Sequence, residues 1–437
     1  LRRIDRAAEA PCAAARPVRV AHLIPTSEGA VWASEMIERL SARGYEMLAV
    51  INGDGGSLAA RLRKGGIPVH VIPVAAWRAP ASLPRLVRLL RRERVDIVHT
   101  HLYRGQIFGR IAARAAGVPA LATMVAGPWQ LEVPLLALID RMTGWLDDVT
   151  ISSSQYTLDL HRRWGAPSGR QRLIYYGPNA DRFDPASADG GSLRRELGIP
   201  ASAPVVGLVA YFYPPKPFRF IMPPAARGRG IKGHEDAIRA AAIVRARRPD
   251  ARFVFVGGAW GGERGERYLD SLKRLVAELG LKDTVLFPGF RRDIAATLAS
   301  FDIAMQCSLS ENLGGTIEAL LMERPVIATR VGGMTNSVID GETGLLVPPK
   351  DPAALADAVL QLLDDPQRGR ELGRNGRRLM LERFTLEQTV DDVDRLYREL
   401  IGAKRPQRLG AGTAGRAPAP NVIQPARPGR VRKGAPG

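Results

Sequence analysis

The sequence predicts an α/β protein built from two doubly wound, Rossmann-like domains that face each other across a cleft. Short apolar runs alternate with longer amphipathic segments along most of the 437 residues, as is typical of parallel sheets covered by helices. A stretch that contains proline, serine and glycine, residues 184–202, interrupts this alternation near the middle of the chain. The alternation then resumes, and the chain is long enough to form two substantial cores.

Each half contains six apolar runs of strand length. In the first half we expect strands at residues 18–24, 46–51, 69–72, 97–100, 120–125 and 149–152, with helices such as 33–42 and 83–93 between them. In the second half we expect strands at residues 205–210, 251–256, 284–287, 303–306, 326–329 and 344–347. Ligands of such sheets bind outside the carboxyl ends of the strands, so we expect both halves to contribute to one site.

These patterns divide the chain into six segments. They are a loose leader (1–17), a first domain (18–184), a linker (185–202), a second domain (203–385), a final helix (386–402) and a basic tail (403–437). The tail is rich in glycine, proline, alanine and arginine, and it cannot bury enough apolar surface to order itself. We therefore expect it to be disordered.

The net charge of +19 is concentrated at the chain ends. Residues 403–437 contain eight Lys or Arg and no acid, and residues 1–19 contain five against two, so the ends contribute +8 and +3. This distribution, with only 6% aromatic residues, does not favour specific nucleic-acid binding. No apolar run is long enough to span a bilayer, and two cysteines do not form a disulfide framework, so we expect a cytoplasmic protein.

The most informative segment is residues 308–329, which follows the strand expected at 303–306. It places Glu311, Gly314, Gly315 and Glu318 between that strand and a helix that begins at or just after Gly315. Glycines allow a ligand close to the backbone, and free helix amides attract an anion, so a phosphate and a polyol could both bind here. The alternative is an ordinary helix start that is capped by Ser310 or Asn312.

This segment resembles the signature of the retaining glycosyltransferases of the GT-B fold, glycosyltransferase family four, which use nucleotide-sugar donors. Further similar segments follow in the expected order and together cover about residues 18–402. They are residues 96–101 (DIVHTH), 173–183 (LIYYGPNADRF), 230–234 (GIKGH), 287–291 (FPGFR), 331–333 (VGG) and 340–348 (DGETGLLVP).

The resemblance implies the roles of the donor-binding residues. Lys232 would bind the diphosphate and Glu318 the ribose hydroxyls, whereas Glu311 would approach the transferred sugar near its reacting carbon. The remaining donor-binding residues that it implies are Gly29, Arg291, Leu313, Gly314 and Gly315. As alternatives, Lys232 could be a solvated lysine at a loop tip, and Gly29 could simply begin a helix.

His99 and His101 lie at the end of one strand, and we expect them to face opposite sides of the sheet. We assign His101 to the cleft as a second catalytic residue and His99 to the core. Two histidines without a nearby carboxylate or cysteine do not suggest a zinc site, and the resemblance implies that no metal or other cofactor is needed.

The sequence departs from the family pattern in three places. Six residues separate Glu311 from Glu318 where seven are typical, and Ala126 stands where a His-Gly pair is frequent. The turn at 210–216 lacks the usual arginine, so Lys216, Arg219, Arg227 or Arg229 could substitute from an insert at 211–230. We expect that insert to be a mobile loop over the cleft.

The resemblance implies transfer of a hexosyl or N-acetylhexosaminyl unit, with retention, from a nucleotide diphosphate sugar, most simply a UDP-sugar. The acceptor would be a sugar or lipid-linked sugar of a surface polysaccharide. The alternatives are a UDP-sugar epimerase of the same fold and a non-catalytic nucleotide-sugar-binding protein. The arginine-rich helix at 83–94 suggests either peripheral contact with the inner face of the plasma membrane or a plain surface helix packed on the sheet.

Overall fold

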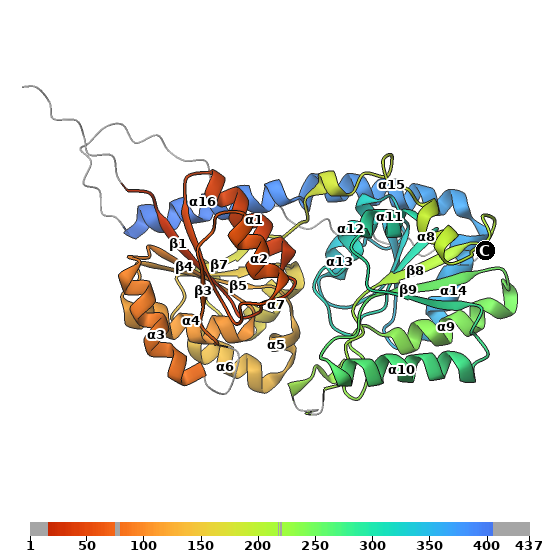
Figure 1. Ribbon diagram of the computed structural model, residues 1–437, viewed down its shortest axis with the longest axis horizontal. Coiled ribbons are helices and arrows are strands. Elements are labelled where there is room, and N and C mark those ends of the chain that lie inside the picture. Colours follow the sequence, from red (N-terminus) through yellow and green to blue (C-terminus); the bar gives the residue numbers. More distant parts are fainter. Residues whose placement is uncertain (1–15, 75–78, 217, 219–220, 405–437) are drawn as a thin grey trace, which may run out of the picture. The chain divides into compact units, whose positions relative to one another are not determined.

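A computed structural model describes residues 16–404 except 75–78, 217 and 219–220 (Figure 1). Two parallel sheets, each with helices on its faces, form the two halves of this part of the chain. The α/β fold with two doubly wound sheets is therefore confirmed. The leader before residue 16 and the tail after residue 404 lie outside the described residues.

The first sheet has seven strands in the order β3-β2-β1-β4-β5-β6-β7. Their bounds are β1 Arg19–Ile24, β2 Glu46–Ile51, β3 Val69–Val71, β4 Ile97–His101, β5 Ala120–Val125, β6 Val149–Ser152 and β7 Gln171–Leu173. The six expected strands are all present. The seventh, β7, was not expected, because a three-residue strand with a glutamine and an arginine gives no apolar run.

The second sheet has six strands in the order β10-β9-β8-β11-β12-β13. Their bounds are β8 Val205–Val209, β9 Arg252–Val256, β10 Val285–Gly289, β11 Ile303–Gln306, β12 Val326–Thr329 and β13 Gly344–Val347. All six were expected to within about two residues at each end. Their apolar side chains on the two faces of the sheet belong to two separate core clusters, which is why these strands read as continuous apolar runs.

Helices cover both sheets. In the first half they are α1 Val31–Ala42, α2 Ser57–Lys64, α3 Ala79–Arg92, α4 Tyr103–Ala116, α5 Trp129–Glu132, α6 Pro134–Gly144 and α7 Gln155–Arg163. The others are α8 Gly191–Glu196, α9 His234–Arg247, α10 Glu263–Glu278, α11 Ile294–Ala299, α12 Thr316–Leu321, α13 Met334–Ser337, α14 Pro352–Asp364, α15 Pro366–Arg383 and α16 Leu386–Lys404.

The segment expected to be a plain linker belongs partly to the second core. It contains α8, and its Leu193 and Ile199 are buried in the same cluster as Phe301. The arginine and glycine content of this segment concealed those two apolar anchors. The linker assignment is therefore wrong for this part of the chain.

The final helix, α16, packs on the first half of the chain after α15 has covered the second (Figure 1). Val390, Val393 and Leu396 are buried in the cluster that also contains Met36 and Leu40 of α1. The regularly spaced apolar side chains of α16 thus attach the C-terminal end of the described chain to the core of the first half.

The arginine-rich helix α3 packs its apolar side on the first sheet. Leu86 and Leu90 are fully or almost fully buried in the cluster that also contains Leu23 and Val98. This is the packing on the sheet that the surface-helix interpretation predicts. Within the described residues, no helix combines the length and the apolar character needed to cross a membrane.

Candidate functional site

A cavity of about 310 Å³ lies at the carboxyl ends of three strands of the second sheet, and we call it the C-half pocket. Val209, Val256 and Gln306, the last residues of β8, β9 and β11, all line it. Its other lining residues are Ala210, Tyr211, Tyr213, Lys232, Gly257, Phe290, Arg291, Ile294, Leu298, Gly314, Gly315 and Glu318. Five residues expected to bind a donor therefore meet in one cavity, namely Lys232, Arg291, Gly314, Gly315 and Glu318.

Lys232 reaches this pocket from the turn before α9. Gly233 adopts a left-handed conformation with φ of 68°, and a Cβ there would lie 2.0 Å from the carbonyl oxygen of Cys307, so only glycine fits without a shift. The Lys232 ammonium forms an ion pair with the carboxylate of Glu311. The altered spacing of Glu311 from Glu318 thus does not prevent Glu311 from reaching the lysine at this site.

Glu311 is held by two further hydrogen bonds. Ser308 Oγ donates to Glu311 Oε2 at 3.1 Å, and the backbone amide of Asn312 donates to Oε1 at 3.1 Å. Both partners come from the same short loop after β11. These two hydrogen bonds therefore come from the loop that contains Glu311, and neither comes from α12.

Glu318 lies in the first turn of α12, and burial raises the pKa of its carboxyl group. Its Oε2 atom is buried and has no hydrogen-bond partner among the described residues. An unsatisfied buried carboxylate oxygen costs free energy. A ligand hydroxyl in the C-half pocket would remove that cost.

Gly314 and Gly315 bring the backbone to the rim of the pocket. Gly314 has φ of 58°, and a Cβ on Gly315 would lie 2.6 Å from Gln306 Nε2. The neighbouring Leu313 points away, because its side chain is fully buried in the second core. Only the backbone of Leu313 could contact a ligand.

The aromatic end of the pocket is formed by Tyr211 and Phe290, whose stacked rings have centroids 5.8 Å apart. The guanidinium of Arg291 is engaged by two carboxylates, at 2.7 Å from Asp293 Oδ2 and 2.6 Å from Glu196 Oε2. Arg291 therefore shapes this end of the pocket, while its charge is already paired.

Three of the four cations proposed to assist Lys232 are described by the structure, and none of these three lines the C-half pocket. Lys216 places its ammonium 4.1 Å from the centre of the Trp129 ring, and Arg229 pairs with Asp236. Arg219 lies outside the described residues, and Arg227 is exposed. Among the described residues, Lys232 is the only cation lining this pocket whose charge faces Glu311.

The described part of the insert at 211–230 is packed, which corrects the expectation of a mobile loop. Met222 and Ala226 are buried together with Leu309, and Phe212 forms a β-bridge with Ala259. The prolines of the insert shape a short 3-10 turn, Pro224–Ala226, that presents these apolar groups. Residues 217, 219 and 220 of the insert lie outside the described part.

Gly29 and His101 are not in the C-half pocket. Gly29 has φ of 67°, and a Cβ there would meet nothing within 4 Å, so this loop before α1 has open space for a ligand. His101 is fully buried, and the edge of Trp32 packs at 5.4 Å between ring centroids. The expectation that His101 faces the cleft is therefore wrong.

The two histidines of β4 also lie on the same face of the sheet, and not on opposite faces. Residues i and i+2 of a strand share a face, and the ring centroids of His99 and His101 are 4.3 Å apart. His22 of β1, which sequence reasoning missed, joins them: its Nδ1 lies 3.0 Å from His101 Nε2. The adjacent pairing of β1 and β4 brings the three together.

This histidine cluster is buried and contacts α16 through Tyr397, whose hydroxyl lies 2.6 Å from His99 Nδ1. Burial lowers the pKa of His99 to about 3 and those of His22 and His101 well below their usual range. One ligand atom from each ring lies within 4.8 Å of the others, a spacing that a metal ion could bridge. That no metal is required stays a prediction.

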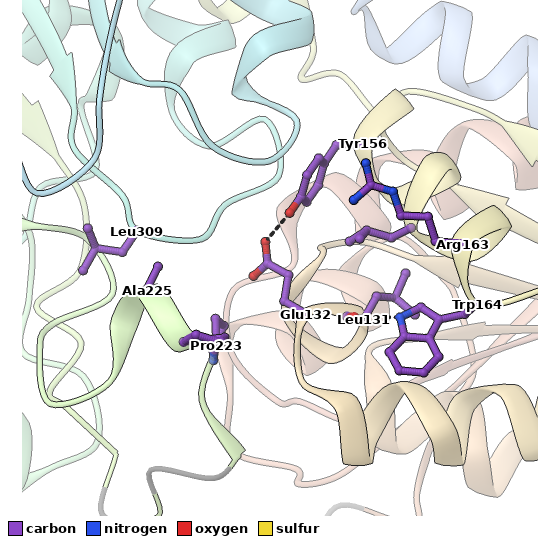
Figure 2. A pocket seen from close by; sticks show the side chains of 10 residues that line it. Leu131, Glu132, Tyr156, Arg163, Trp164, Pro223, Ala225 and Leu309 are labelled. Carbon is purple, nitrogen blue, oxygen red and sulfur yellow. Dashed lines mark hydrogen bonds between the residues drawn. The ribbon is translucent and has the colours of Figure 1, made fainter.

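A second cavity, of about 570 Å³, is lined by residues of both halves, and we call it the Glu132 pocket (Figure 2). Glu132 of α5 accepts hydrogen bonds from the Tyr156 hydroxyl at 3.0 Å and from Ser310 Oγ. Sequence reasoning missed Glu132, because α5 is a four-residue helix without a recognisable motif. Only the fold brings it to the loop that contains Glu311.

Two more hydrogen bonds join the halves beside this loop. Asn312 Nδ2 donates to Ser153 Oγ at 3.1 Å, and the backbone amide of Gln155 donates to Asn336 Oδ1 at 3.0 Å. The carboxyl-end loops of the two sheets thus contact each other. The Glu132 pocket, which residues of both halves line, lies at this junction.

Comparisons with known proteins agree with this geometry. Residues 215–379 match the family model described as glycosyl transferases group 1, and residues 29–177 match a glycosyl transferase 4-like domain. The D-inositol 3-phosphate glycosyltransferase of Acidothermus cellulolyticus is 30% identical over 78% of this chain and 75% of its own length. The 2-deoxystreptamine glucosyltransferase of Streptomyces kanamyceticus is 28% identical over 83% of this chain and 94% of its own.

Among solved structures, HepE of Anabaena in complex with UDP-glucose has the same fold. Its TM-score is 0.72 at 21% identity, covering 87% of this chain and 99% of that one. The two sheets therefore have the GT-B fold, and the family models and curated relatives identify a glycosyltransferase. The chain belongs to the family of group 1 glycosyl transferases.

Proposed function

We propose that this enzyme transfers a hexosyl or N-acetylhexosaminyl unit from a UDP-sugar, with retention, to a sugar or lipid-linked sugar acceptor in surface polysaccharide synthesis. The observation that carries the proposal is the meeting of Lys232, with its cationic side chain, and the unsatisfied Glu318 carboxylate in the C-half pocket. A cation suits a diphosphate, and a carboxylate suits the vicinal hydroxyls of a ribose. The Anabaena relative in complex with UDP-glucose supports UDP as the nucleotide.

In this proposal each residue has a separate task. Lys232 neutralises charge that develops on the departing diphosphate, and the backbone amides at Gly314 and Gly315 assist it. Glu311 lies beside Lys232 and would approach the transferred sugar. The arrangement uses a cation where other enzymes use a metal ion, so transfer proceeds without added divalent metal.

A panel of UDP, GDP, UDP-glucose and UDP-N-acetylglucosamine in thermal unfolding experiments tests the donor. A ligand present at a hundred times its dissociation constant stabilises the fold by about 2.7 kcal/mol. We expect the uridine nucleotides to raise the melting temperature and GDP to raise it less. Stabilisation by none of them would contradict the proposal. Proton NMR of the glycosidic product then reads the anomeric configuration, and an inverted product would exclude retention.

We also propose peripheral contact with the inner face of an anionic membrane through α6. The exposed face of this helix and of the residue that follows it is apolar. It contains Leu135, Leu138, Met142 and Trp145, whose exposed fractions are 46% to 69%. Helix α4, which contacts α6, and helix α3, which packs on α4, contain six further arginines besides the buried Arg110 and no acid. The one acid of α6, Asp140, is buried and paired with Arg110. Two of these arginines pair with acids of the adjoining loops, Arg92 with Glu93 and Arg114 with Asp148, and an apolar face beside the other arginines suits anionic lipid.

Sedimentation with phosphatidylglycerol vesicles tests this contact. Replacing Met142 and Trp145 by serine should reduce binding, whereas Leu381→Ser, which changes a side chain of similar exposure in the second half, should not. Equal binding of both variants would assign any lipid affinity to another part of the chain.

A further inference from the structure

We propose that the Glu132 pocket binds the acceptor and that this acceptor is a sugar or cyclitol with an anionic group. The inference rests on the proposed function, since it assigns the second substrate of the same reaction. It also assigns a chemical class to that substrate, which the donor site does not define.

The Glu132 pocket lies next to the loop that contains Glu311. Leu309 lines the pocket (Figure 2), and Ser310, the next residue, donates a hydrogen bond to Glu132. Glu311 follows directly and pairs with Lys232 of the C-half pocket. One four-residue loop, 308–311, thus connects the two cavities, as the transfer of a sugar between two bound substrates requires.

Glu132 provides the group that would orient an acceptor hydroxyl. Figure 2 shows its carboxylate and the Tyr156 hydroxyl directed at each other, with Leu309 and Ala225 on the opposite side of the pocket. Burial raises the pKa of Glu132, and the nearby charge of Glu311 raises it too. A hydroxyl donated to this carboxylate would stabilise its ionised form and stand next to the loop of Glu311.

Arg163 provides the anion contact. It lines the pocket at the end of α7, is exposed, and makes no ion pair or hydrogen bond with another described residue. Its neighbour Arg162, in contrast, pairs with Asp159 at 3.3 Å. A free guanidinium beside a cavity suits a phosphate or carboxylate, which it can bind with two parallel hydrogen bonds.

The apolar part of the pocket suits the C–H face of a ring. The indole of Trp164 is fixed by its Nε1, which donates to the carbonyl of Leu131 at 3.1 Å, and prolines of the insert line the other side. The volume of about 570 Å³ lies in the usual range for small-molecule sites. Hydroxyl, anion and apolar contacts therefore occur together in one cavity.

The test measures binding of two probes to the full chain in the presence of saturating UDP. The probes are myo-inositol 3-phosphate and uncharged myo-inositol, which differ only in the anionic group. We expect wild type to bind the phosphate about tenfold more tightly, as a charge-assisted contact gives. Arg163→Gln should abolish that preference, whereas the matched control Arg162→Gln should keep it.

Glu132→Gln should weaken both probes, because both have hydroxyls. Ser310→Ala removes one of the hydrogen bonds between the halves but keeps the Glu132 carboxylate, and this variant should bind both probes like wild type. All variants should bind UDP normally. The failure of wild type to bind UDP would refute the proposed function itself, a result distinct from the failure of this inference.

A second arm distinguishes a soluble from a lipid-linked acceptor. In this arm, phosphatidylcholine vesicles that contain phosphatidylinositol replace the soluble probe. If the protein binds these vesicles and Arg163→Gln abolishes the binding, the pocket binds a lipid headgroup. The inference is overturned if UDP binds but neither probe arm does, or if Arg163→Gln leaves the preference for phosphate unchanged.

Discussion

Lys232, which lines the C-half pocket, forms an ion pair with Glu311, so the cation assigned to the donor diphosphate already has a carboxylate partner in this structure. A diphosphate would have to compete with Glu311 for the ammonium. The pair is partly exposed, with side-chain exposures of 20% and 16%, which limits the strength of the interaction. This competition leads to a prediction about Glu311.

Glu311→Gln should bind UDP more tightly than wild type, by about 1 kcal/mol or less, because the competing charge is gone. Turnover should nevertheless fall, since the carboxylate near the transferred sugar is lost. Calorimetry with UDP and an initial-rate assay measure the two effects. Glu278→Gln, an exposed change on α10, is the control and should alter neither. Weaker UDP binding by Glu311→Gln would mean that Glu311 contacts the donor favourably.

The pH dependence of uridine binding should follow Glu318. Burial raises the pKa of this carboxyl group, and a ribose hydroxyl binds best to its ionised form. Uridine affinity should therefore fall, as pH is lowered, at a higher pH than an ordinary glutamate would produce. Uridine is used because it has no titrating phosphate. Glu318→Gln should bind uridine more weakly and without this pH dependence; an unchanged profile in the variant would remove Glu318 from the site.

The same raised pKa has a consequence for stability. The folded protein binds this proton more tightly than the unfolded chain does, so the free energy of unfolding decreases as pH rises through the range between the two pKa values. Glu318→Gln should remove this decrease. Urea unfolding at several pH values measures it in wild type and variant.

Gly332 should be more sensitive to substitution than Gly341, although both have positive φ, of 54° and 74°. Alanine at Gly341 meets nothing within 4 Å, so it should cost only the left-handed backbone penalty of about 1–2 kcal/mol. A Cβ at Gly332 would lie 1.7 Å from the carbonyl oxygen of Glu311, which adds about 1–3 kcal/mol of overpacking and displaces the Glu311 loop. Urea unfolding compares the two; equal losses would contradict the close contact.

Arg110 holds together a buried ionic cluster in the first half. Its guanidinium lies 2.8 Å from Asp147 Oδ2 and 2.8 Å from Asp140 Oδ1, and all three residues are buried. Arg110→Leu should destabilise the fold by about 3–5 kcal/mol, because two buried carboxylates lose their partner. Part of the loss should be recovered at low pH, where the carboxylates are protonated. Arg141→Leu, which changes an exposed arginine of α6, is the control. A similar loss of stability in that variant would mean that the buried ion pairs do not cause the effect.

Much of the fold followed from local patterns, because each buried parallel strand is an apolar run. The strand bounds 46–51, 120–125, 149–152, 303–306, 326–329 and 344–347 were predicted to the residue. Edge strand β7 and helix α8 were not, since three polar-rich residues and two isolated apolar anchors leave no periodic signal. Lys232, Gly314, Gly315 and Glu318, which line the C-half pocket, could be predicted because they lie in one short segment and one turn.

The rest of the site depends on contacts between distant segments. Glu132 and Ser310 are far apart in sequence, and no local motif relates them. His22 meets His99 and His101 only because β1 and β4 are neighbours. The expectation that His99 and His101 face opposite sides of the sheet was wrong, because residues i and i+2 of a strand lie on the same face.

Calorimetry of UDP, UMP and uridine with wild type and Lys232→Ala tests whether Lys232 binds the diphosphate of a nucleotide sugar. The substitution should weaken UDP binding by about 1.5–3 kcal/mol, the range for a charge-assisted contact, while leaving uridine nearly unchanged and UMP in between. Arginine at this position should restore the affinity only in part, because its planar group does not match a compact ammonium. Equal losses of affinity for all three ligands would show the opposite, namely that Lys232 shapes the loop without contacting phosphate.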